Sequence, residues 1–576
     1  MSEGSDTRVR NVVIVGGGTA GWMTATLLSR ALGDQVHIRL VESDDIGTVG
    51  VGESTIPSIR LINAFLGLDE DDLLRSVQGT IKLGIQFNDW HRIGESYLHA
   101  FGDIGLPLGL LPFHPYWLRS RRDPTAPDLW AYSLNARAIA AQRFARMERV
   151  DGTPLTGPRW AYHLDAGLYA RYLRRHAAQN VQRTEGKVIK VHLRAADGFI
   201  ESVQLASGET IAGDLFIDCS GFRGLLIEDA LRTGYEDWRH WLPCDRAVVA
   251  PSSRVEPLRP FTQANARPAG WQWRIPLQHR SGNGHVYCSQ FIGDDEAAAL
   301  LVENIEGELL EQPRLLRFTS GMRRQSWNRN CVALGLAAGF MEPLESTSIH
   351  LIQSGVQRLL ALFPDRHCDA ALVAEYNRQT RFEYERVRDF LILHYRAIER
   401  RDTPFWQHCA QIAMPEPLER KLALFHSGGR IVRDGDELFA EPAWLQVMLG
   451  QGIEPASHPP LADTLPQAQL DEFLSHIRTL LDRAVGSMPE HAQFIARHNR
   501  EIISRISYWT SEAPSVVRSL IEHLRMRSST LRLRVGGLEA STLIELTAFG
   551  TAVVMNHRYT RTLGRTSRGR TTGNDR

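Results

Sequence analysis

Three glycines near the N-terminus have the spacing of a phosphate-binding turn. Gly16, Gly18 and Gly21 form a G-x-G-x-x-G pattern, which follows the β-branched run Asn11–Val15 and opens a stretch with helical spacing of its apolar residues. Glycines there allow a tight turn, so that backbone N–H groups can approach a pyrophosphate. Glu42 ends a second predicted strand, where an acid can hold a ribose hydroxyl. The pattern predicts a dinucleotide site, and a purely structural turn is the alternative.

Two later segments favour FAD over NAD or NADP. Residues 213–221 and 331–339 each form an apolar run that ends in small residues, which permit a close backbone approach. The second segment leads through Ser346–Ser348, which are N-cap candidates, into a predicted helix. Such a helix start suits a flavin carbonyl, the negative charge of reduced flavin or a halide, because its N–H groups are unpaired. An ordinary capped core helix would explain the serines but not the glycines.

The surrounding elements predict an α/β fold. Residues 11–15, the helix after Gly18 and residues 36–42 form a β-α-β unit. After Cys331 the pattern is largely helical to about Leu524. Other expected elements are strands at 188–193, 200–205, 214–219 and 271–292, and a helix at 134–149.

We expect one interleaved fold with a helical cover. The expected divisions are an FAD-binding module over 1–355, a mainly helical substrate-binding region over 356–524, and a C-terminal segment over 525–576. The residues after Asn556 are rich in Arg, Thr and Gly with few large apolar side chains, which predicts disorder. A basic tail that contacts an acidic partner is the alternative.

Composition excludes several classes of protein. The 576 residues include 66 Lys+Arg and 66 Asp+Glu, so that no net field attracts nucleic acid or anionic lipid, and neither is an expected partner. The apolar stretch 543–555 is too short to span a membrane and carries Glu545, and the polar N-terminus lacks a signal-peptide core. Six cysteines without a C-x-x-C pair favour a reduced, cytoplasmic setting, and no metal site is expected.

Five motifs in this chain resemble those of the flavin-dependent tryptophan halogenase family. They lie in the family's order over roughly residues 11–360, and W-x-W-x-I-P is the most diagnostic of them. The motifs are GGGTAGWM at 16–23, VGVGESTIP at 49–57, GTIKLGIQF at 79–87, WQWRIP at 271–276 and GFMEPLESTSIHL at 339–351. The resemblance implies a Rossmann-like FAD-binding fold of the flavin monooxygenase/halogenase type.

The chemistry that the resemblance implies has two stages. Reduced FAD, which a separate flavin reductase delivers by diffusion, reacts with oxygen, and chloride or bromide held beside the flavin becomes hypohalous acid. This oxidant passes through an internal tunnel to Lys82, which hydrogen-bonds it or forms a haloamine. Glu345 positions the electrophile or helps to remove the ring proton.

Physical reasoning supports the lysine assignment. Lys82 lies between Ile81 and Leu83, and a lysine in an apolar setting is costly to desolvate unless it is partnered. Burial also lowers a lysine pKa toward reactivity. The alternatives are a solvated Lys82 and a Glu345 that only caps the following helix.

The resemblance also assigns binding residues. The implied FAD contacts are Gly16, Gly18, Thr19, Ala20, Gly21 and Glu42, then Val188 at the adenine end, and Leu336 and Ile349 at the isoalloxazine. Halide contacts map to Thr347 and Ser348. Many members carry glycine at the second position, where a β-carbon narrows the allowed backbone angles, and halide preference stays open.

The implied substrate site has an aromatic wall. His99 and Phe101 match the family's stacking position for an indole ring, although His99 could instead be a satisfied core histidine. The stretch 443–451, which contains Trp444, lacks the tyrosine pair and the Phe-Trp pair with which free-tryptophan enzymes grip the amino acid. This departure favours indole or another uncharged aromatic over free tryptophan.

Trp271 and Trp273 have two compatible interpretations. On an alternating strand both side chains point the same way and can form a core face. In the family they lie near the flavin, where their bulk keeps the organic substrate away from it.

Two rival functions remain open. A flavin monooxygenase that hydroxylates an aromatic would share the fold, and a flavoprotein that only docks or senses a partner would share the cofactor. We expect no NADPH site because the sequence has a single nucleotide fingerprint. The expected ligand is a small aromatic, and a homodimer is allowed.

Overall fold

This computed structural model describes residues 7–45, 52–177 and 180–497, with strands β23 (Leu531–Val535) and β24 (Thr542–Leu546). The chain divides into two compact units, Met1–His498 and Asn499–Arg576. In the second unit, β23 and β24 pair in antiparallel fashion. The tail after Asn556 lies outside the described residues.

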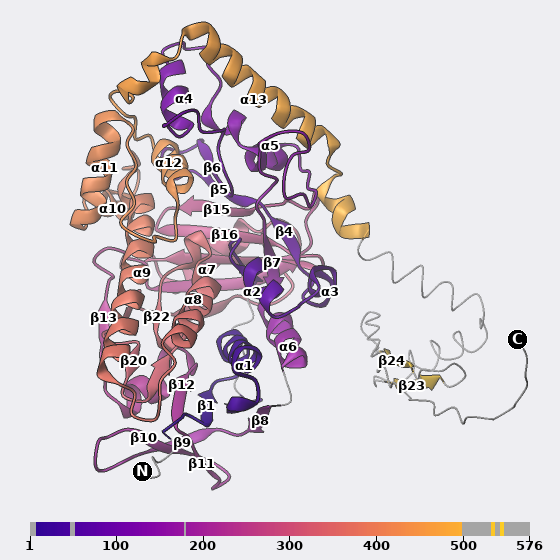
Figure 1. Cartoon of the computed structure of the whole chain (residues 1–576), viewed down its shortest axis with the longest axis vertical. Coiled ribbons are helices and arrows are strands. Elements are labelled where there is room, and N and C mark those ends of the chain that lie inside the picture. The colour runs from indigo at the N-terminus through magenta and orange to yellow at the C-terminus, as the bar shows by residue number, and fades with distance from the viewer. Residues whose placement is uncertain (1–6, 46–51, 178–179, 498–530, 536–541, 547–576) are drawn as a thin grey trace, which may run out of the picture. The chain divides into compact units, whose positions relative to one another are not determined.

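A six-stranded sheet carries the glycine turn of the first unit (Figure 1). Its order is β20-β21-β12-β1-β2-β8, and all neighbouring pairs are parallel except β20 with β21. The strands are β20 (Trp327–Asn328), β21 (Cys331–Ala333), β12 (Leu215–Asp218), β1 (Asn11–Val15), β2 (His37–Glu42) and β8 (Val181–Glu185). This order of parallel strands confirms the α/β, Rossmann-like prediction.

The central strand β1 is apolar because both of its faces are covered. Val12 and Ile14 face the core that includes α1 (Thr19–Leu32), whereas Val13 and Val15 join a second core with β9 (Val188–Leu193) and β10 (Ile200–Leu205). The sequence of a parallel strand that is buried on both faces is therefore a continuous apolar run.

A seven-stranded sheet and a small three-stranded sheet lie above this module in Figure 1. The larger sheet has the order β18-β14-β17-β16-β15-β5-β6, and only β15 with β5 is parallel. Its strands are β18 (Arg314–Arg317), β14 (Arg246–Ser253), β17 (Arg280–Tyr287), β16 (Gly270–Pro276), β15 (Thr262–Arg267), β5 (Gly84–Asn88) and β6 (Ser96–Ala100). The smaller sheet joins β3 (Gly52–Ser54), β7 (Ala161–Asp165) and β4 (Thr80–Lys82).

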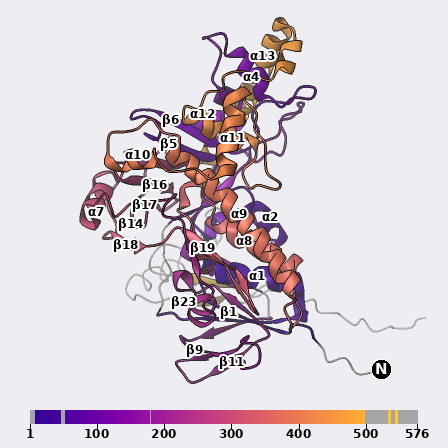
Figure 2. The same cartoon turned by 90° about the vertical axis from the view of Figure 1, so that its left-hand side faces the viewer.

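Helices and short sheets complete the first unit. Figure 2 shows α8 and α9 beside each other, and the two helices are in contact. The α-helices are α2 (Ile59–Phe65), α3 (Glu70–Ser76), α4 (His114–Ser120), α5 (Leu134–Ala140), α6 (Ala166–His176), α7 (Asp294–Glu303), α8 (Ser348–Ala361), α9 (Ala370–Arg396), α10 (Pro404–Cys409), α11 (Glu416–Gly428), α12 (Glu441–Gly450) and α13 (Gln467–Ser487). The other strands are β11 (Thr210–Ala212), which extends β9-β10, and β13 (Tyr235–Asp237), β19 (Gly321–Arg323) and β22 (Gly339–Phe340). The short 3-10 helices are η1 (Gly33–Gln35), η2 (Leu129–Tyr132), η3 (Gly221–Arg223), η5 (Gly335–Ala337), η6 (Pro343–Glu345) and η7 (Pro460–Thr464), and η4 (Leu225–Ala230) is a π-helix.

The helix expected over 134–149 is shorter than its sequence pattern suggests. It ends at Ala140, and Gln142 adopts a positive φ of 53°. Beyond that point Arg143 donates hydrogen bonds to carbonyls at the end of α13, and the amide of Phe144 bonds to Pro489. Tertiary hydrogen bonds therefore override the local helical pattern.

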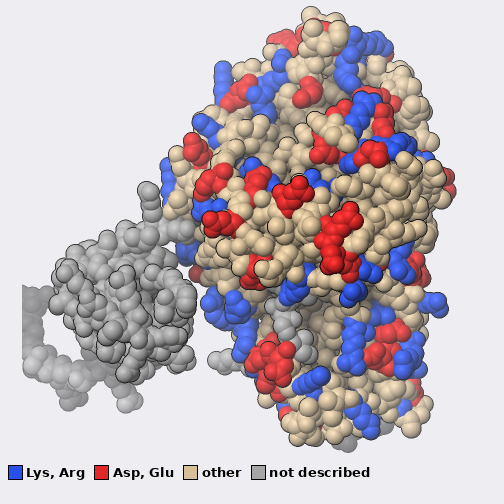
Figure 3. Space-filling model, turned by 180° about the vertical axis from the view of Figure 1, so that it is seen from behind, with Lys and Arg blue, Asp and Glu red and all other residues tan. Residues whose placement is uncertain are grey.

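The described surface mixes both signs of charge. On the face drawn in Figure 3, Lys and Arg side chains lie among Asp and Glu side chains, as the balanced composition leads one to expect. In the part of the chain that the structure describes, no helix combines the length and apolarity needed to cross a membrane.

The glycine turn gives a stability prediction. A β-carbon at Gly21 would lie 1.8 Å from the backbone oxygen of Gly16, so we expect Gly21→Ala to destabilise the fold by roughly 2 kcal/mol or more. Gly486 lies within α13 with no neighbouring heavy atom within 4 Å of an added β-carbon. Gly486→Ala should therefore stabilise by about 0.5–1 kcal/mol. Thermal melts followed by circular dichroism would test both, and equal melting temperatures for the two variants would contradict this close packing.

Candidate active site

The glycine turn is shaped to receive a phosphate group. Gly18 precedes α1 without any side-chain cap, and the space beside its α-carbon is open, with no heavy atom within 4 Å of an added β-carbon. Thr19 and Ala20 form the first turn of α1, so their N–H groups lie at the positive end of the helix dipole. These features fit the pyrophosphate of a dinucleotide.

Glu42 lies beside this turn at the end of β2. Its carboxylate accepts hydrogen bonds from Trp22 Nε1 at 3.1 Å and from Arg183, and a β-carbon at Gly17 would collide with it. The bonds hold Glu42 against the turn, in the place where a ribose-binding acid is expected. The predicted adenine contact, Val188, is buried at the start of β9.

The two residues predicted to contact the isoalloxazine lie in η5 and at the start of α8. Leu336 lies partly exposed in η5, and Ile349 is buried in the first turn of α8. A β-carbon at Gly335 would lie 2.8 Å from Ala20, which shows how closely η5 approaches the start of α1. Because α8 contacts both α1 and η5, the segment that contains η5 and α8 meets the distant N-terminal helix here.

Lys82 is buried at the end of β4 with 0% exposure. Its Nζ donates a hydrogen bond to Ser346 Oγ at 2.8 Å and lies 5.1 Å from the centroid of the Phe101 ring. Burial lowers the pKa of Lys82 to about 7, although the charge of Glu345 opposes this change. The expected partner Glu345 therefore acts on Lys82 through its charge, while the hydrogen bond from Lys82 Nζ goes to the neighbouring residue, Ser346.

Glu345, at the end of η6, accepts a hydrogen bond from a histidine at each carboxylate oxygen. His99 Nδ1 lies 2.7 Å from Oε2, and His394 Nε2 lies 2.8 Å from Oε1. Burial by itself raises the pKa of Glu345, but His99 and His394 together lower it to about 2. His394 was missed from the sequence, although a histidine inside the apolar run Phe390–Tyr395 of α9 was a usable signal.

The aromatic rings near His99 form a wall. The ring of Phe101 stands edge-on to His99 at 6.4 Å, and Phe390 and Phe439 approach the same histidine at 5.7 and 6.2 Å between ring centroids. Trp444 lies against Phe390, with its ring centroid 4.8 Å away and its Nε1 bonded to Glu437. Trp444 thus backs the wall through Phe390.

The tryptophan pair is buried on one face of β16. The ring centroids of Trp271 and Trp273 are 6.0 Å apart and both side chains are buried, which agrees with the core interpretation, while the exclusion of substrate from the flavin stays a prediction. Trp271 Nε1 bonds to Glu342 Oε2 at 2.6 Å, and Tyr395 bonds to the same oxygen. Burial raises the pKa of Glu342 to about 7, a feature that sequence reasoning did not find.

The start of α8 differs from the predicted serine cap. Ser346 has a φ of 60° and precedes the helix, Thr347 occupies the N-cap position without a side-chain hydrogen bond, and Ser348 is the first helical residue. The hydroxyl of Ser346 instead serves Lys82. The helix therefore keeps uncapped N–H groups, as an anion site requires.

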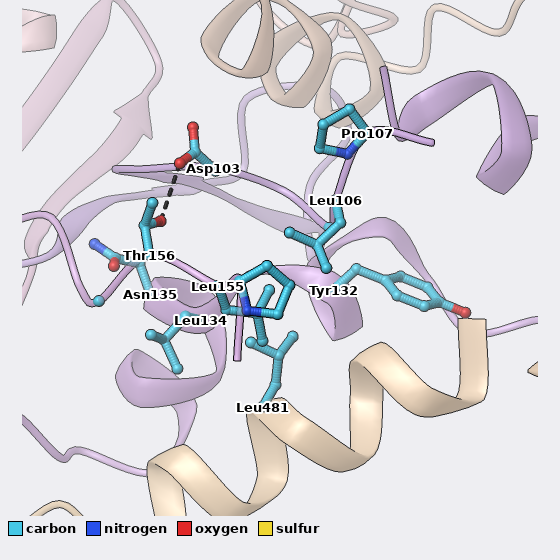
Figure 4. Close-up of a pocket in the computed structure, with 12 residues that line it drawn as sticks. Asp103, Leu106, Pro107, Tyr132, Leu134, Asn135, Leu155, Thr156 and Leu481 are labelled. Atoms are coloured by element: carbon cyan, nitrogen blue, oxygen red, sulfur yellow. Dashed lines mark hydrogen bonds between the residues drawn. The ribbon is translucent and has the colours of Figure 1, made fainter. Parts of the chain in front are cut away.

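A cavity of about 180 Å³ lies among η2, α5, α13 and the loops that contain Leu106 and Leu155 (Figure 4). Its wall includes Leu106, Leu134 and Leu481, and Asp103 accepts a hydrogen bond from Thr156 at its edge. None of the site residues predicted from sequence lines this cavity. Within the described residues no group of three or more His, Cys, Asp or Glu side chains could hold a metal ion.

Burial of Lys82 leads us to expect a free energy of unfolding that depends on pH. The folded-state pKa of about 7 lies below the unfolded value of 10.5, so the unfolded chain binds more protons between these limits and stability rises with pH there. We expect Lys82→Met to be more stable than wild type near pH 7. This advantage should shrink by roughly 1 kcal/mol per pH unit up to pH of about 9.5. Parallel urea titrations would measure it, and an advantage independent of pH would contradict the burial of a titrating amine.

Comparison with known proteins agrees with this geometry. The sequence profile described as tryptophan halogenase matches residues 11–467. Tryptophan 7-halogenase RebH from Lentzea aerocolonigenes is 32% identical over 529 residues, which cover 85% of this chain and 99% of the relative.

Solved structures show the same likeness. Xcc4156, a flavin-dependent halogenase from Xanthomonas campestris, is 48% identical with a TM-score of 0.82, and the match covers 85% of this chain and 98% of that one. BrvH, a flavin-dependent halogenase from Brevundimonas sp. BAL3, is 46% identical with a TM-score of 0.82, over 86% of this chain and 100% of that one. From the match over most of its length, the chain belongs to the tryptophan halogenase family.

Proposed function

We propose that this chain is an FAD-dependent halogenase that attaches chlorine or bromine to an electron-rich aromatic ring through hypohalous acid. The observation that carries the proposal is a fully buried lysine with a pKa of about 7, held by Ser346 beside an aromatic wall. When bound, reduced FAD supplies the electrons that convert oxygen and halide into hypohalous acid. A separate flavin reductase is the proposed source of that reduced flavin.

The residues of the glycine turn would hold the cofactor at one end. Gly16, Gly18 and Gly21 would shape the turn around the pyrophosphate, and Glu42, held beside this turn, would bind a ribose hydroxyl. At the other end Ile349 would contact the flavin ring, while Thr347 and Ser348 at the uncapped start of α8 would bind halide.

Lys82 can handle hypohalous acid in two protonation states. At a pKa of about 7 the neutral amine and the ammonium are both populated near neutral pH. The amine can attack the halogen to form an N–X bond and release water, and the ammonium can instead hydrogen-bond the oxidant. Both routes deliver an electrophile next to Phe101, where Lys82 already lies.

We further propose an uncharged aromatic such as indole as the substrate class, in preference to free tryptophan. In the stretch 443–451, the side-chain amide of Gln446 exchanges two hydrogen bonds with the backbone of Ala100, and Trp444 Nε1 donates a hydrogen bond to Glu437. Lys421 in turn pairs with Glu437. These polar groups are therefore engaged by the protein itself, which leaves them poorly suited to hold the ammonium and carboxylate of an amino acid.

The catalytic lysine gives the first activity test. With reduced FAD, oxygen, bromide and indole we expect bromoindole by mass spectrometry, and Lys82→Ala should lower turnover at least 100-fold because the electrophile is no longer held. Lys190→Ala, at an exposed site on β9, is the matched control and should keep wild-type turnover.

Two results would reject the halogenase proposal. Oxygen incorporation that does not depend on halide would support the hydroxylase rival instead. If the protein binds FAD but turns over no member of a broad panel of aromatics, the result would support the second rival, a flavoprotein that only docks or senses a partner.

The substrate class gives a second test. We expect kcat/KM for indole to exceed that for free tryptophan at least 10-fold, because an amino acid's charged ends would lose hydration without gaining partners. Initial rates with both substrates at one bromide concentration would measure the ratio. A preference for free tryptophan would contradict the assignment.

A further inference from the structure

We propose that His99 is the base that takes the proton from the halogenated ring carbon, and that Glu345 is the positioning residue that holds and polarises His99. The inference rests on the proposed halogenation and deepens it. Three observations support it. Glu345 accepts hydrogen bonds from two histidines, His99 Nε2 has no hydrogen-bond partner in the described part of the chain, and His99 and Lys82 both lie near the ring of Phe101.

Hydrogen-bond directions assign the proton on each ring nitrogen. An ionised carboxylate only accepts, so both nitrogens that face Glu345 must carry hydrogen: Nδ1 of His99 and Nε2 of His394. In the neutral ring of His394 the other nitrogen, Nδ1, then accepts from the hydroxyl of Tyr97 at 3.0 Å. The chain of bonds therefore ends on Glu345 from both sides, and each carboxylate oxygen is engaged.

Glu345 is consequently a poor proton acceptor. Each oxygen keeps a second lone pair, but a proton placed there would make the carboxyl group neutral and weaken the N–H···O bonds from both histidines, in a site with 1% exposure. A carboxylate of this kind instead stabilises a cation that forms on the imidazole it holds, as in a Ser-His-Asp triad.

His99 has a nitrogen available for the task. With Nδ1–H bonded to Glu345, Nε2 is the nitrogen that can take up a proton, and it has no hydrogen-bond partner in the described part of the chain. Phe101 is near both reactive groups: its ring centroid is 5.1 Å from Lys82 Nζ and 6.4 Å from the centroid of the His99 ring. An aromatic substrate that packs on Phe101 would thus have the halogen donor and the base as neighbours.

The proposed step balances. The ring carbon attacks the halogen of hypohalous acid, so that a C–X bond forms while the O–X bond breaks, and the oxygen leaves as water with a proton from the Lys82 ammonium. The C–H bond at that carbon then breaks, its electron pair restores the aromatic ring, and the proton moves to His99 Nε2. Return of this proton to Lys82 through solvent completes conversion of the aromatic and hypohalous acid into halo-aromatic and water.

An isotope effect separates a base from a merely packed histidine. The experiment measures kcat in separate reactions with indole and with indole deuterated at every ring carbon, with bromide as the halide. In wild type we expect a ratio near 1, because a good base makes proton loss fast. In His99→Gln, whose amide can still donate to Glu345 but cannot take a proton, we expect kcat to fall at least 10-fold and the ratio to rise to about 2 or more.

His394→Gln is the matched control. It removes the other histidine bonded to Glu345 but leaves His99 Nε2 in place, so kcat can fall while the ratio stays near 1. FAD binding, followed by flavin fluorescence, and melting temperature would confirm that both variants fold.

The outcomes are distinct. A ratio near 1 in His99→Gln, or an equal rise in both variants, would overturn the assignment of His99 as the base. Failure of wild type to form bromoindole at all would instead reject the proposed function. A raised ratio in His99→Gln alone supports the assignment.

Discussion

The site depends on keeping two opposite ionisable groups out of water at adjoining positions. Lys82 and Glu345 are both almost fully buried, and burial disfavours the charged form of each. The protein treats them differently. Glu345 receives two imidazole N–H donors and stays ionised, whereas Lys82 receives one hydroxyl acceptor, and its pKa falls toward neutrality. The same desolvation thus yields a stable anion beside a reactive amine.

This arrangement requires an unusual backbone between the two groups. Ser346 follows Glu345 with a φ of 60°, in the left-handed region that costs a non-glycine residue roughly 1–2 kcal/mol. The turn is held by the bond from the Ser346 amide to Pro343 and by the bond between its hydroxyl and Lys82. With this turn, the Glu345 side chain points toward His99 and the Ser346 hydroxyl points toward Lys82. The turn also leaves the start of α8 without a side-chain cap.

The fold brings these parts together from distant segments. Lys82 and Ser346 are 264 residues apart, and His99 and Glu345 are 246 residues apart. The parallel sheet places the glycine turn and Glu42 at the ends of neighbouring strands, as the β-α-β pattern predicts, while β4, β6 and α9 supply the lysine and both histidines. The short turn before α8 therefore connects the proposed cofactor end with the proposed substrate end.

The sequence by itself determined the features that are local in the chain. The glycine spacing, the apolar strand before it and the acid that ends β2 predicted a Rossmann-like turn, because strand, turn and helix propensities act over a few residues. Ordered motifs indicated the family and singled out Lys82 and Glu345. Only the tertiary structure decided that the hydroxyl of Ser346 bonds to Lys82, that His99 and His394 share Glu345, and that Trp444 lies behind Phe390. It also ended the helix predicted over 134–149 at Ala140, through contacts with residues near the end of α13. Hydrogen bonds and pKa values in a buried site depend on groups hundreds of residues apart, and no local pattern records which of them will meet.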